Sequence, residues 1–156
     1  VLGGHRLNLS MGFRFTANLR VRFHGMVDDG YKYSLMQKSK GLIFPVRWNE
    51  PFGLAIAESL YCGCPVFGTP YGSLSEIVTK EVGFLSNSSS DLVSAMRDSD
   101  SWSKDYCHEY ASEKFNSLKM ALSYTEIYDK VLSGGVLNET NPTPSENPNT
   151  PLLWLD

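Results

Sequence analysis

The chain has 156 residues, of which 42% are hydrophobic and 20% are charged, and its formal net charge is −3. This length suffices for one ordinary domain with its own core, and the composition is typical of a soluble globular protein. The negative charge, without any block of Lys or Arg, argues against nucleic-acid binding, and no apolar run is long enough to span a bilayer.

Cysteine usage and the N-terminal residues point to a reducing compartment. The three cysteines, Cys62, Cys64 and Cys107, are an odd set without the spacing of a disulfide framework, so we interpret them as structural thiols. Val1–Arg6 lacks the layout of a signal peptide. We therefore expect a cytoplasmic location, at most peripheral to the inner membrane.

The first forty residues carry weak patterns. Val1–Gly4 has the pattern of the end of a strand, which suggests that a first strand and helix are missing upstream. His5–Asn18 is mixed and predicts a helix or irregular structure. Val21–Gly25 alternates and predicts a strand. An aspartate at position 28 or 29 can then cap a helix that runs to about Gln37.

The central stretch carries the strongest pattern. Gly41–Val46 is a nearly continuous apolar run and predicts a strand buried on both faces of a parallel sheet. A short loop follows, and a helix is expected from near Phe52 to Gly63. Glu50 precedes this helix, where the dipole end is positive, and Glu58 lies on a helical stripe that is otherwise apolar. A carboxylate on such a stripe is costly to bury without a partner.

Strands and helices continue to alternate after this helix. Val66–Gly68 and Gly83–Leu85 predict strands, Ser73 with Glu76 fits a capping box that starts a short helix, and Asp91–Met96 predicts another helix. This alternation favours an α/β fold, a Rossmann-like parallel sheet with helices on both faces and right-handed crossovers.

From Ser101 onward the pattern is helical only, with a broad apolar stripe that ends at Gly134–Gly135. The residues that follow are rich in Asn, Pro, Thr and Ser. We therefore expect one domain over residues 1–133 and a disordered tail over 134–156. The apolar end of that tail, Leu152–Leu155, could dock on the domain, but an unstructured end is the preferred interpretation.

Several of these motifs resemble one family. Glu50 and Glu58, with seven residues between them and Pro-Phe-Gly-Leu after the first, resemble the paired-glutamate motif of retaining GT-B glycosyltransferases of family 4. The downstream runs Gly63–Thr69 and Tyr71–Val78 are similar to the same family, and the similarity extends from about position 21 to position 84. The resemblance implies the C-terminal, donor-binding half of a GT-B fold. The N-terminal domain of the enzyme, with the acceptor site, would then lie outside this chain.

The turn before the central helix is suited to a sugar phosphate. Ligands of open α/β sheets bind outside the carboxyl ends of the strands. There the backbone N–H groups of Phe52, Gly53 and Leu54 can hold sugar hydroxyls and diphosphate oxygens at the start of a helix. Gly53 permits close approach because it has no Cβ. This arrangement needs no metal ion and no cofactor.

The resemblance implies a role for individual side chains. Glu50 would be the catalytic residue, in contact with hydroxyls of the donor sugar and close to its anomeric carbon. Glu58 would accept hydrogen bonds from both ribose hydroxyls of a UDP-, GDP- or ADP-linked sugar. Met26 and Pro45 would grip the base, which is a weaker assignment. The expected reaction is retaining transfer of a hexosyl group from this donor to an acceptor hydroxyl.

Structural interpretations of the same residues remain open. Glu50 could simply stabilise a helix dipole, and Glu58 could be paired with Arg47, which could equally serve the phosphates. Asp98–Asp100 has the D-x-D spacing of metal-binding transferases, but it follows a helix rather than a strand, so we expect a solvated loop.

One departure from the family limits the expected activity. The Arg and Lys that usually neutralise the leaving diphosphate would precede the first strand and are not found here. We therefore expect weak phosphate binding and no catalysis by these 156 residues without the N-terminal domain. The alternative is a non-catalytic nucleotide or sugar-phosphate binding module with the same fold. A related epimerase or phosphorylase is disfavoured, because the Pro-Phe-Gly-Leu turn is foreign to the first and a pyridoxal lysine signature of the second is absent.

Overall fold

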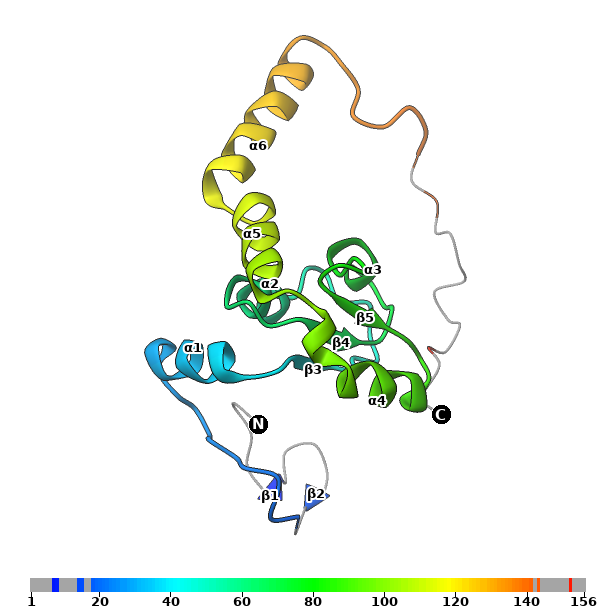
Figure 1. Ribbon diagram of the computed structural model, residues 1–156. Helices are drawn as coiled ribbons and strands as arrows, with labels where there is room; N and C mark the ends of the chain where they lie inside the picture. Colours follow the sequence, from blue (N-terminus) through cyan, green and yellow to red (C-terminus); the bar gives the residue numbers. More distant parts are fainter. Residues whose placement is uncertain (1–6, 9–13, 16–17, 142, 144–151, 153–156) are drawn as a thin grey trace. The chain divides into compact units, whose positions relative to one another are not determined.

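The structure is a computed structural model that describes residues 7–8, 14–15, 18–141, 143 and 152. The chain divides into two compact units, Val1–Ser39 and Lys40–Asp156 (Figure 1). The strand expected at the very start, over Val1–Gly4, lies outside the described residues.

The first unit contains a small antiparallel pair and one helix. Strand β1 (Leu7–Asn8) pairs with β2 (Arg14–Phe15), with Leu7 opposite Phe15. The prediction of a helix or irregular structure over this stretch is therefore wrong at these four residues. The mixed pattern of apolar and basic residues gave no period-two signal, because each strand is only two residues long.

Helix α1 (Asp29–Lys38) follows as predicted, with its boundary one residue later. Its cap is Asp28, whose carboxylate accepts a hydrogen bond from the Tyr31 amide at 2.9 Å. The strand predicted over Val21–Gly25 is wrong, since no strand forms over Val21–His24. An alternating pattern measures how well side chains suit a pleated surface, whereas a strand also needs a neighbour in register.

The second unit is built on a parallel sheet. Its strands are β3 (Leu42–Phe44), β4 (Val66–Gly68) and β5 (Gly83–Leu85), in the order β3-β4-β5. Both pairings are parallel, and Leu42, Val66 and Gly83 stand at the same level. The three predicted strands are confirmed at these positions.

Helices fill the connections between the strands and continue after the last one. The first connection uses α2 (Leu54–Tyr61), the second uses α3 (Leu74–Ile77), and α4 (Ser89–Arg97) follows β5. A short 3₁₀ turn, η1 (Ser99–Ser101), leads to the last two helices, α5 (Lys104–Lys114) and α6 (Ser117–Leu132).

Two successive residues of β4 show that helices cover both faces of the sheet. Val66 is buried in the core cluster with Leu60 of α2 and Ala111 of α5. Phe67 points to the other face, because side chains alternate along a strand. There its ring meets the edge of Trp102, with 5.4 Å between centroids, and α4 contacts β4 and β5 (Figure 1). The predicted α/β fold with helices on both faces is confirmed.

Strand β3 departs from the prediction of burial on both faces. Leu42 and Phe44 pack against the core, but Ile43 between them is 60% exposed. Within the second unit β3 is an edge strand, and Ile43 is far more exposed than Phe67, its register partner on the same face of the sheet. The central strand β4 fits the prediction instead, because all three of its residues are buried.

The terminal helices differ in how far they are buried. Cys107 and Ala111 anchor α5 in the core, and Phe115 packs against it. In contrast α6 has no buried residue, and apolar side chains of the predicted stripe, such as Leu118 and Tyr128, are 69% and 59% exposed. Residues 134–141 form neither helix nor strand. Disorder of the tail remains a prediction.

The cysteines agree with their interpretation as structural thiols. All three are free, with Cys64 and Cys107 buried and Cys62 half-buried. Burial raises the pKa of the Cys107 thiol to about 11, and it also raises the pKa of Cys64. Of the described helices, none has the combination of length and hydropathy that a membrane crossing requires.

Candidate functional site

The turn between β3 and α2 is shaped by a glycine. Gly53 caps α2 in the left-handed region, with φ +81°, so that the chain reverses sharply before the helix begins at Leu54. A Cβ there would lie 2.6 Å from Ile56 Cδ1. The helix thus starts two residues later than predicted, because Gly53 breaks the helical conformation that the pattern assigned to it.

Within the described residues, three backbone amides at this turn have no hydrogen-bond acceptor, although Gly53 itself is buried. The first bonds of α2 run from the Ile56 and Ala57 amides to the Gly53 carbonyl. For the amides of Phe52, Gly53 and Leu54, no acceptor is found among the residues that the structure describes. Amides at a helix start, with the dipole behind them, favour anions and polar oxygens.

Glu50, which precedes this turn, is held through both its backbone and its side chain. Its backbone forms a parallel bridge with Gly72, and its carbonyl accepts a hydrogen bond from the Ser73 amide at 2.8 Å. Its side chain accepts a hydrogen bond from Trp48 Nε1, also at 2.8 Å. Glu50 itself is half-buried. The acid therefore has a fixed position beside Gly53, where a Cβ would lie 3.5 Å from Glu50 Cγ.

The loop after β4 contacts the Glu50 backbone through Gly72 and Ser73. Thr69 is buried, and its hydroxyl donates to the Val46 carbonyl at 2.6 Å, which ties the carboxyl ends of β3 and β4 together. Gly72 has φ +62°, and a Cβ there would lie 2.4 Å from the Glu50 nitrogen and oxygen. Only glycine allows this approach of two backbones.

The predicted capping box of Ser73 and Glu76 is wrong. The helix α3 does begin after Ser73, but Ser73 already has helical dihedral angles and makes no side-chain cap. Its amide is bound to Glu50, and this contact sets a conformation from which the hydroxyl does not cap the helix. The Ser73 Oγ is buried and has no hydrogen-bond partner within the described part of the chain.

Glu58 lies on the open side of α2 rather than on a buried stripe. The core face of α2 consists of Ile56, Ser59 and Leu60, all fully buried. The opposite face carries Leu54 and Tyr61, which are 73% and 56% exposed, together with the half-buried Glu58. Because Glu58 is only half-buried, the cost of burying a carboxylate applies to it only in part. Its carboxylate stands one turn beyond Leu54, about 6 Å further along the helix axis.

The remaining residues that the sequence singled out lie as follows. Pro45 is exposed directly after β3, and Arg47 is exposed two residues later. Met26 is 86% exposed and belongs to the first unit, so a base-binding contact shared with Pro45 stays a prediction.

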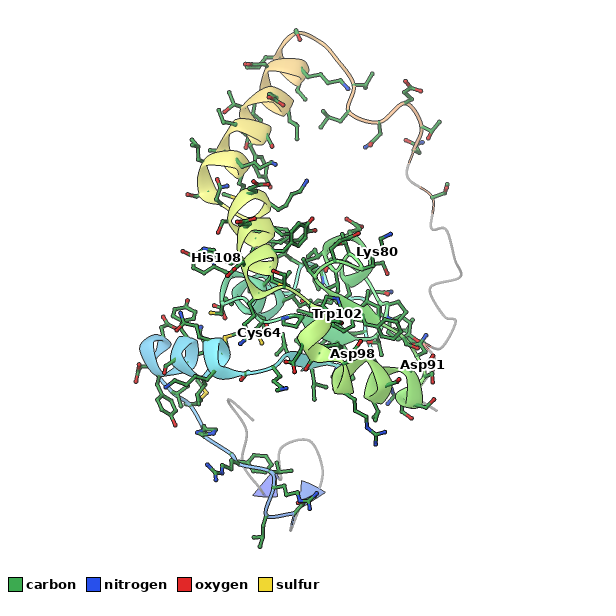
Figure 2. The ribbon with its side chains drawn as sticks, in the orientation of Figure 1. Cys64, Lys80, Asp91, Asp98, Trp102 and His108 are labelled. Atoms are coloured by element: carbon green, nitrogen blue, oxygen red, sulfur yellow. The ribbon has the colours of Figure 1, made fainter. Side chains whose placement is uncertain are left out.

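The stretch from Asp98 to Asp100 is exposed at both acids, but it enters the 3₁₀ turn η1 rather than the loop that we expected. Asp98 ends α4, and the carboxylate of Asp100 pairs with Lys40 Nζ at 2.8 Å, both side chains being exposed. Figure 2 labels Asp98 near the end of α4, together with Trp102, whose indole donates to the Lys80 carbonyl at 3.0 Å. Across the described residues no group of three His, Cys, Asp or Glu side chains is placed to hold a metal ion.

Trp48 is the site residue that the sequence analysis missed. It is 55% exposed, and its indole N–H is bonded to the Glu50 carboxylate. The available signal was the W-x-E spacing, since residues two apart in an extended segment point the same way. A second aromatic contact lies close by in the chain, where Phe52 meets Phe115 edge to face with 5.7 Å between centroids.

Comparison with known proteins identifies relatives over most of this region. A family model described as "Glycosyl transferases group 1" matches residues 16–114. An uncharacterized 41.2 kDa protein in the cps region of Klebsiella pneumoniae is 33% identical over 115 residues, which are 69% of this chain and 32% of that protein. Sucrose synthase 1 of Oryza sativa subsp. japonica is 38% identical over 56 residues, 36% of this chain and 7% of that protein.

Solved structures agree with the fold. Sucrose-phosphate synthase from Thermosynechococcus elongatus superposes with a TM-score of 0.62 at 25% identity, over 74% of this chain and 31% of that one. AviGT4, a glycosyltransferase involved in Avilamycin A biosynthesis, gives a TM-score of 0.60 at 23% identity, over 74% of this chain and 37% of that one. The chain therefore spans about a third of the length of these structures and of the Klebsiella relative.

Proposed function

The chain belongs to the glycosyl transferases group 1 family, and we propose that it binds the nucleotide-sugar donor of a retaining, family 4 hexosyltransferase. In this proposal residues 1–133 are the C-terminal donor domain of a larger GT-B enzyme, and residues 134–156 are a disordered tail. The enzyme moves a hexosyl group from a UDP-, GDP- or ADP-linked sugar to an acceptor hydroxyl, and it needs no metal ion.

The proposal rests on how backbone amides and a carboxylate are arranged at the turn before α2. The amides of Phe52, Gly53 and Leu54 have no acceptor within the described residues, and they lie next to Glu50, whose position is fixed at both its backbone and its side chain. The amides suit the diphosphate oxygens, and Glu50 suits the hydroxyls of the sugar attached to them. During transfer, the amides stabilise the charge that develops on the leaving diphosphate.

Glu58 is proposed to bind the ribose. It stands one turn along α2 from the amide of Leu54, which is the scale of the step from a diphosphate to the adjoining ribose. A carboxylate can accept hydrogen bonds from both ribose hydroxyls at once. The base would then lie further out, and Met26 and Pro45 remain the proposed contacts for it.

The exposed apolar surface supports a larger assembly. Besides Leu54 and Tyr61 on α2, the helix α6 exposes a row of apolar side chains along its whole length. Such a helix is stable when its apolar face is packed against another structure. We propose that the N-terminal domain of the same enzyme covers part of this surface and brings the acceptor.

The test is a binding measurement on this chain with matched variants. The Glu58→Ala variant should weaken binding of UDP-, GDP- or ADP-glucose tenfold to over a hundredfold, as expected for the loss of charge-assisted hydrogen bonds worth about 1.5–3 kcal/mol. Glu126→Ala removes an exposed acid from α6 and should change nothing. Equal affinities of the two variants, measured by calorimetry or NMR titration, would refute the ribose role.

The alternative of a non-catalytic binding module predicts the same binding but no transfer. The genomic sequence upstream of the Val1 codon separates the two. An open reading frame that encodes an α/β domain and a glycine loop with Arg and Lys supports the transferase. A start codon beside Val1 supports the module.

A further inference from the structure

The pair formed by Trp48 and Glu50 has features that a core packing role does not explain. Trp48 is 55% exposed, although a tryptophan gains most from burial of its ring. Its polar atom is nevertheless fully used, because Nε1 donates to Glu50 Oε2 at 2.8 Å. A bond from an indole N–H to a carboxylate is charge-assisted and of well-defined direction. The side chain is thus placed for its N–H rather than for its apolar surface.

Glu50 has little freedom apart from this contact. Its backbone is fixed by the Ser73 amide at 2.8 Å and by the close approach of Gly72. Only the side-chain torsion angles of Glu50 are then free to vary, and the hydrogen bond from Trp48 selects one rotamer. Within the described residues, no other donor to the carboxylate is found. One oxygen is therefore held by Trp48, and the other keeps its full capacity to accept hydrogen bonds.

We propose that Trp48 is a positioning residue for Glu50. Its indole N–H holds one carboxylate oxygen in place, so that the other oxygen meets a hydroxyl of the donor sugar without first losing rotational freedom. This role rests on the proposed function, because it assigns the Glu50 carboxylate to the donor. Holding a contact group in advance strengthens binding, since the entropy of ordering it is not lost on association.

The first readout needs no ligand. In a chain labelled with ¹⁵N, the indole resonance of Trp48 is identified by its loss in Trp48→Phe. Glu50→Gln replaces the charged acceptor with a neutral amide, so it should move this resonance from its wild-type position. The indole of Trp102 donates to a backbone carbonyl and should not move. A Trp48 resonance at the same position in the wild type and in Glu50→Gln would overturn the proposal.

The second readout is the affinity for UDP-, GDP- and ADP-glucose, measured by NMR titration. Trp48→Phe keeps an aromatic ring but loses the indole N–H that donates to Glu50. It should weaken binding about fivefold or more. Trp102→Phe removes an indole bond elsewhere and should leave the affinity unchanged. Because Trp48 acts through Glu50, the double variant with Glu50→Gln should bind no more weakly than Glu50→Gln alone.

The outcomes separate this inference from the proposed function. If the wild type binds a probe and Trp48→Phe binds it equally well, the positioning role is wrong and the donor site stands. If the wild type binds none of the three probes at millimolar concentration, the proposed function is wrong, and the role of Trp48 is overturned with it.

Discussion

The contact between Gly72 and the Glu50 backbone gives a prediction whose size can be worked out. Gly72 has φ +62°, and a Cβ at this position would lie 2.4 Å from the Glu50 nitrogen and oxygen and 2.7 Å from the Asn49 carbonyl carbon. These are backbone atoms, so no side-chain rotation relieves the overlap. In a Gly72→Ala variant the chain around Glu50 must move by about 1 Å to reach ordinary contact distances.

Two free-energy costs add in the Gly72→Ala variant. A residue other than glycine in the left-handed region costs about 1–2 kcal/mol. Loss of the hydrogen bond from the Ser73 amide, with the adjoining bridge, costs roughly 1–2 kcal/mol more. The free energy of unfolding from urea denaturation should therefore fall by about 2–4 kcal/mol at an unchanged m value. Affinity for nucleotide sugars should fall as well, because Glu50 is displaced.

Gly134→Ala is the matched control. Gly134 has φ +82°, but nothing lies within 4 Å of the position of its Cβ. Gly134→Ala therefore has only the cost of a non-glycine residue in the left-handed region, at most about 1–2 kcal/mol. If Gly72→Ala proves as stable as Gly134→Ala and keeps its affinity for the donor, the Gly72 loop does not hold Glu50, and our account of the site fails.

Three further predictions concern the fold around the site. Phe67→Ala removes a ring that is 1% exposed, so the free energy of unfolding should fall by about 3–5 kcal/mol in urea denaturation; a loss below about 1 kcal/mol would contradict its burial. Tyr110→Phe removes the hydroxyl that donates to the Ile77 carbonyl at 2.9 Å and should cost about 1 kcal/mol in the same assay, whereas Tyr124→Phe on the exposed α6 should cost nothing measurable. Burial raises the pKa of Cys107 from 9.0 to about 11, so the folded chain keeps a proton that the unfolded chain releases. Stability should therefore fall as pH rises from about 9 to about 11, by up to roughly 2–3 kcal/mol more in the wild type than in Cys107→Ala, and parallel pH profiles would refute this assignment.

The sheet was predictable because its strands are short apolar runs bounded by Gly and Pro. Val66–Gly68 is such a run, and it is the buried central strand. The same reasoning failed at Ile43, because a run of apolar letters does not say whether its strand is central or at an edge. Val21–Gly25 failed for a related reason, since a period-two pattern does not supply a pairing partner.

Helix α2 shows what a single sequence leaves undetermined. It has apolar residues on both sides, Ile56 and Leu60 on one and Leu54 and Tyr61 on the other. Nothing local tells which side meets the sheet, and the stripe chosen from the sequence is the exposed one. The error changes the physical setting of Glu58, which is half-buried on the side of α2 that does not face the core.

The position of Glu50 in the site depends on contacts between distant segments of the chain. The position of Glu50 before the helix followed from the order of strand, turn and glycine. Its bond to the Ser73 amide joins residues 23 positions apart, and this contact also explains why the Ser73 capping pattern was misleading. The bond from Trp48 spans only two residues, but it depends on side-chain rotamers that a pattern of letters does not encode.

The most direct test of the proposed donor site is a map of which backbone amides respond to a nucleotide sugar. In an NMR titration of the ¹⁵N-labelled chain with UDP-, GDP- and ADP-glucose, we expect saturable shifts at the amides of Phe52, Gly53 and Leu54 for at least one probe. The same shifts should be lost or need far higher concentrations in Glu58→Ala. Amides of this turn that stay unmoved at millimolar concentrations of all three probes would contradict the account.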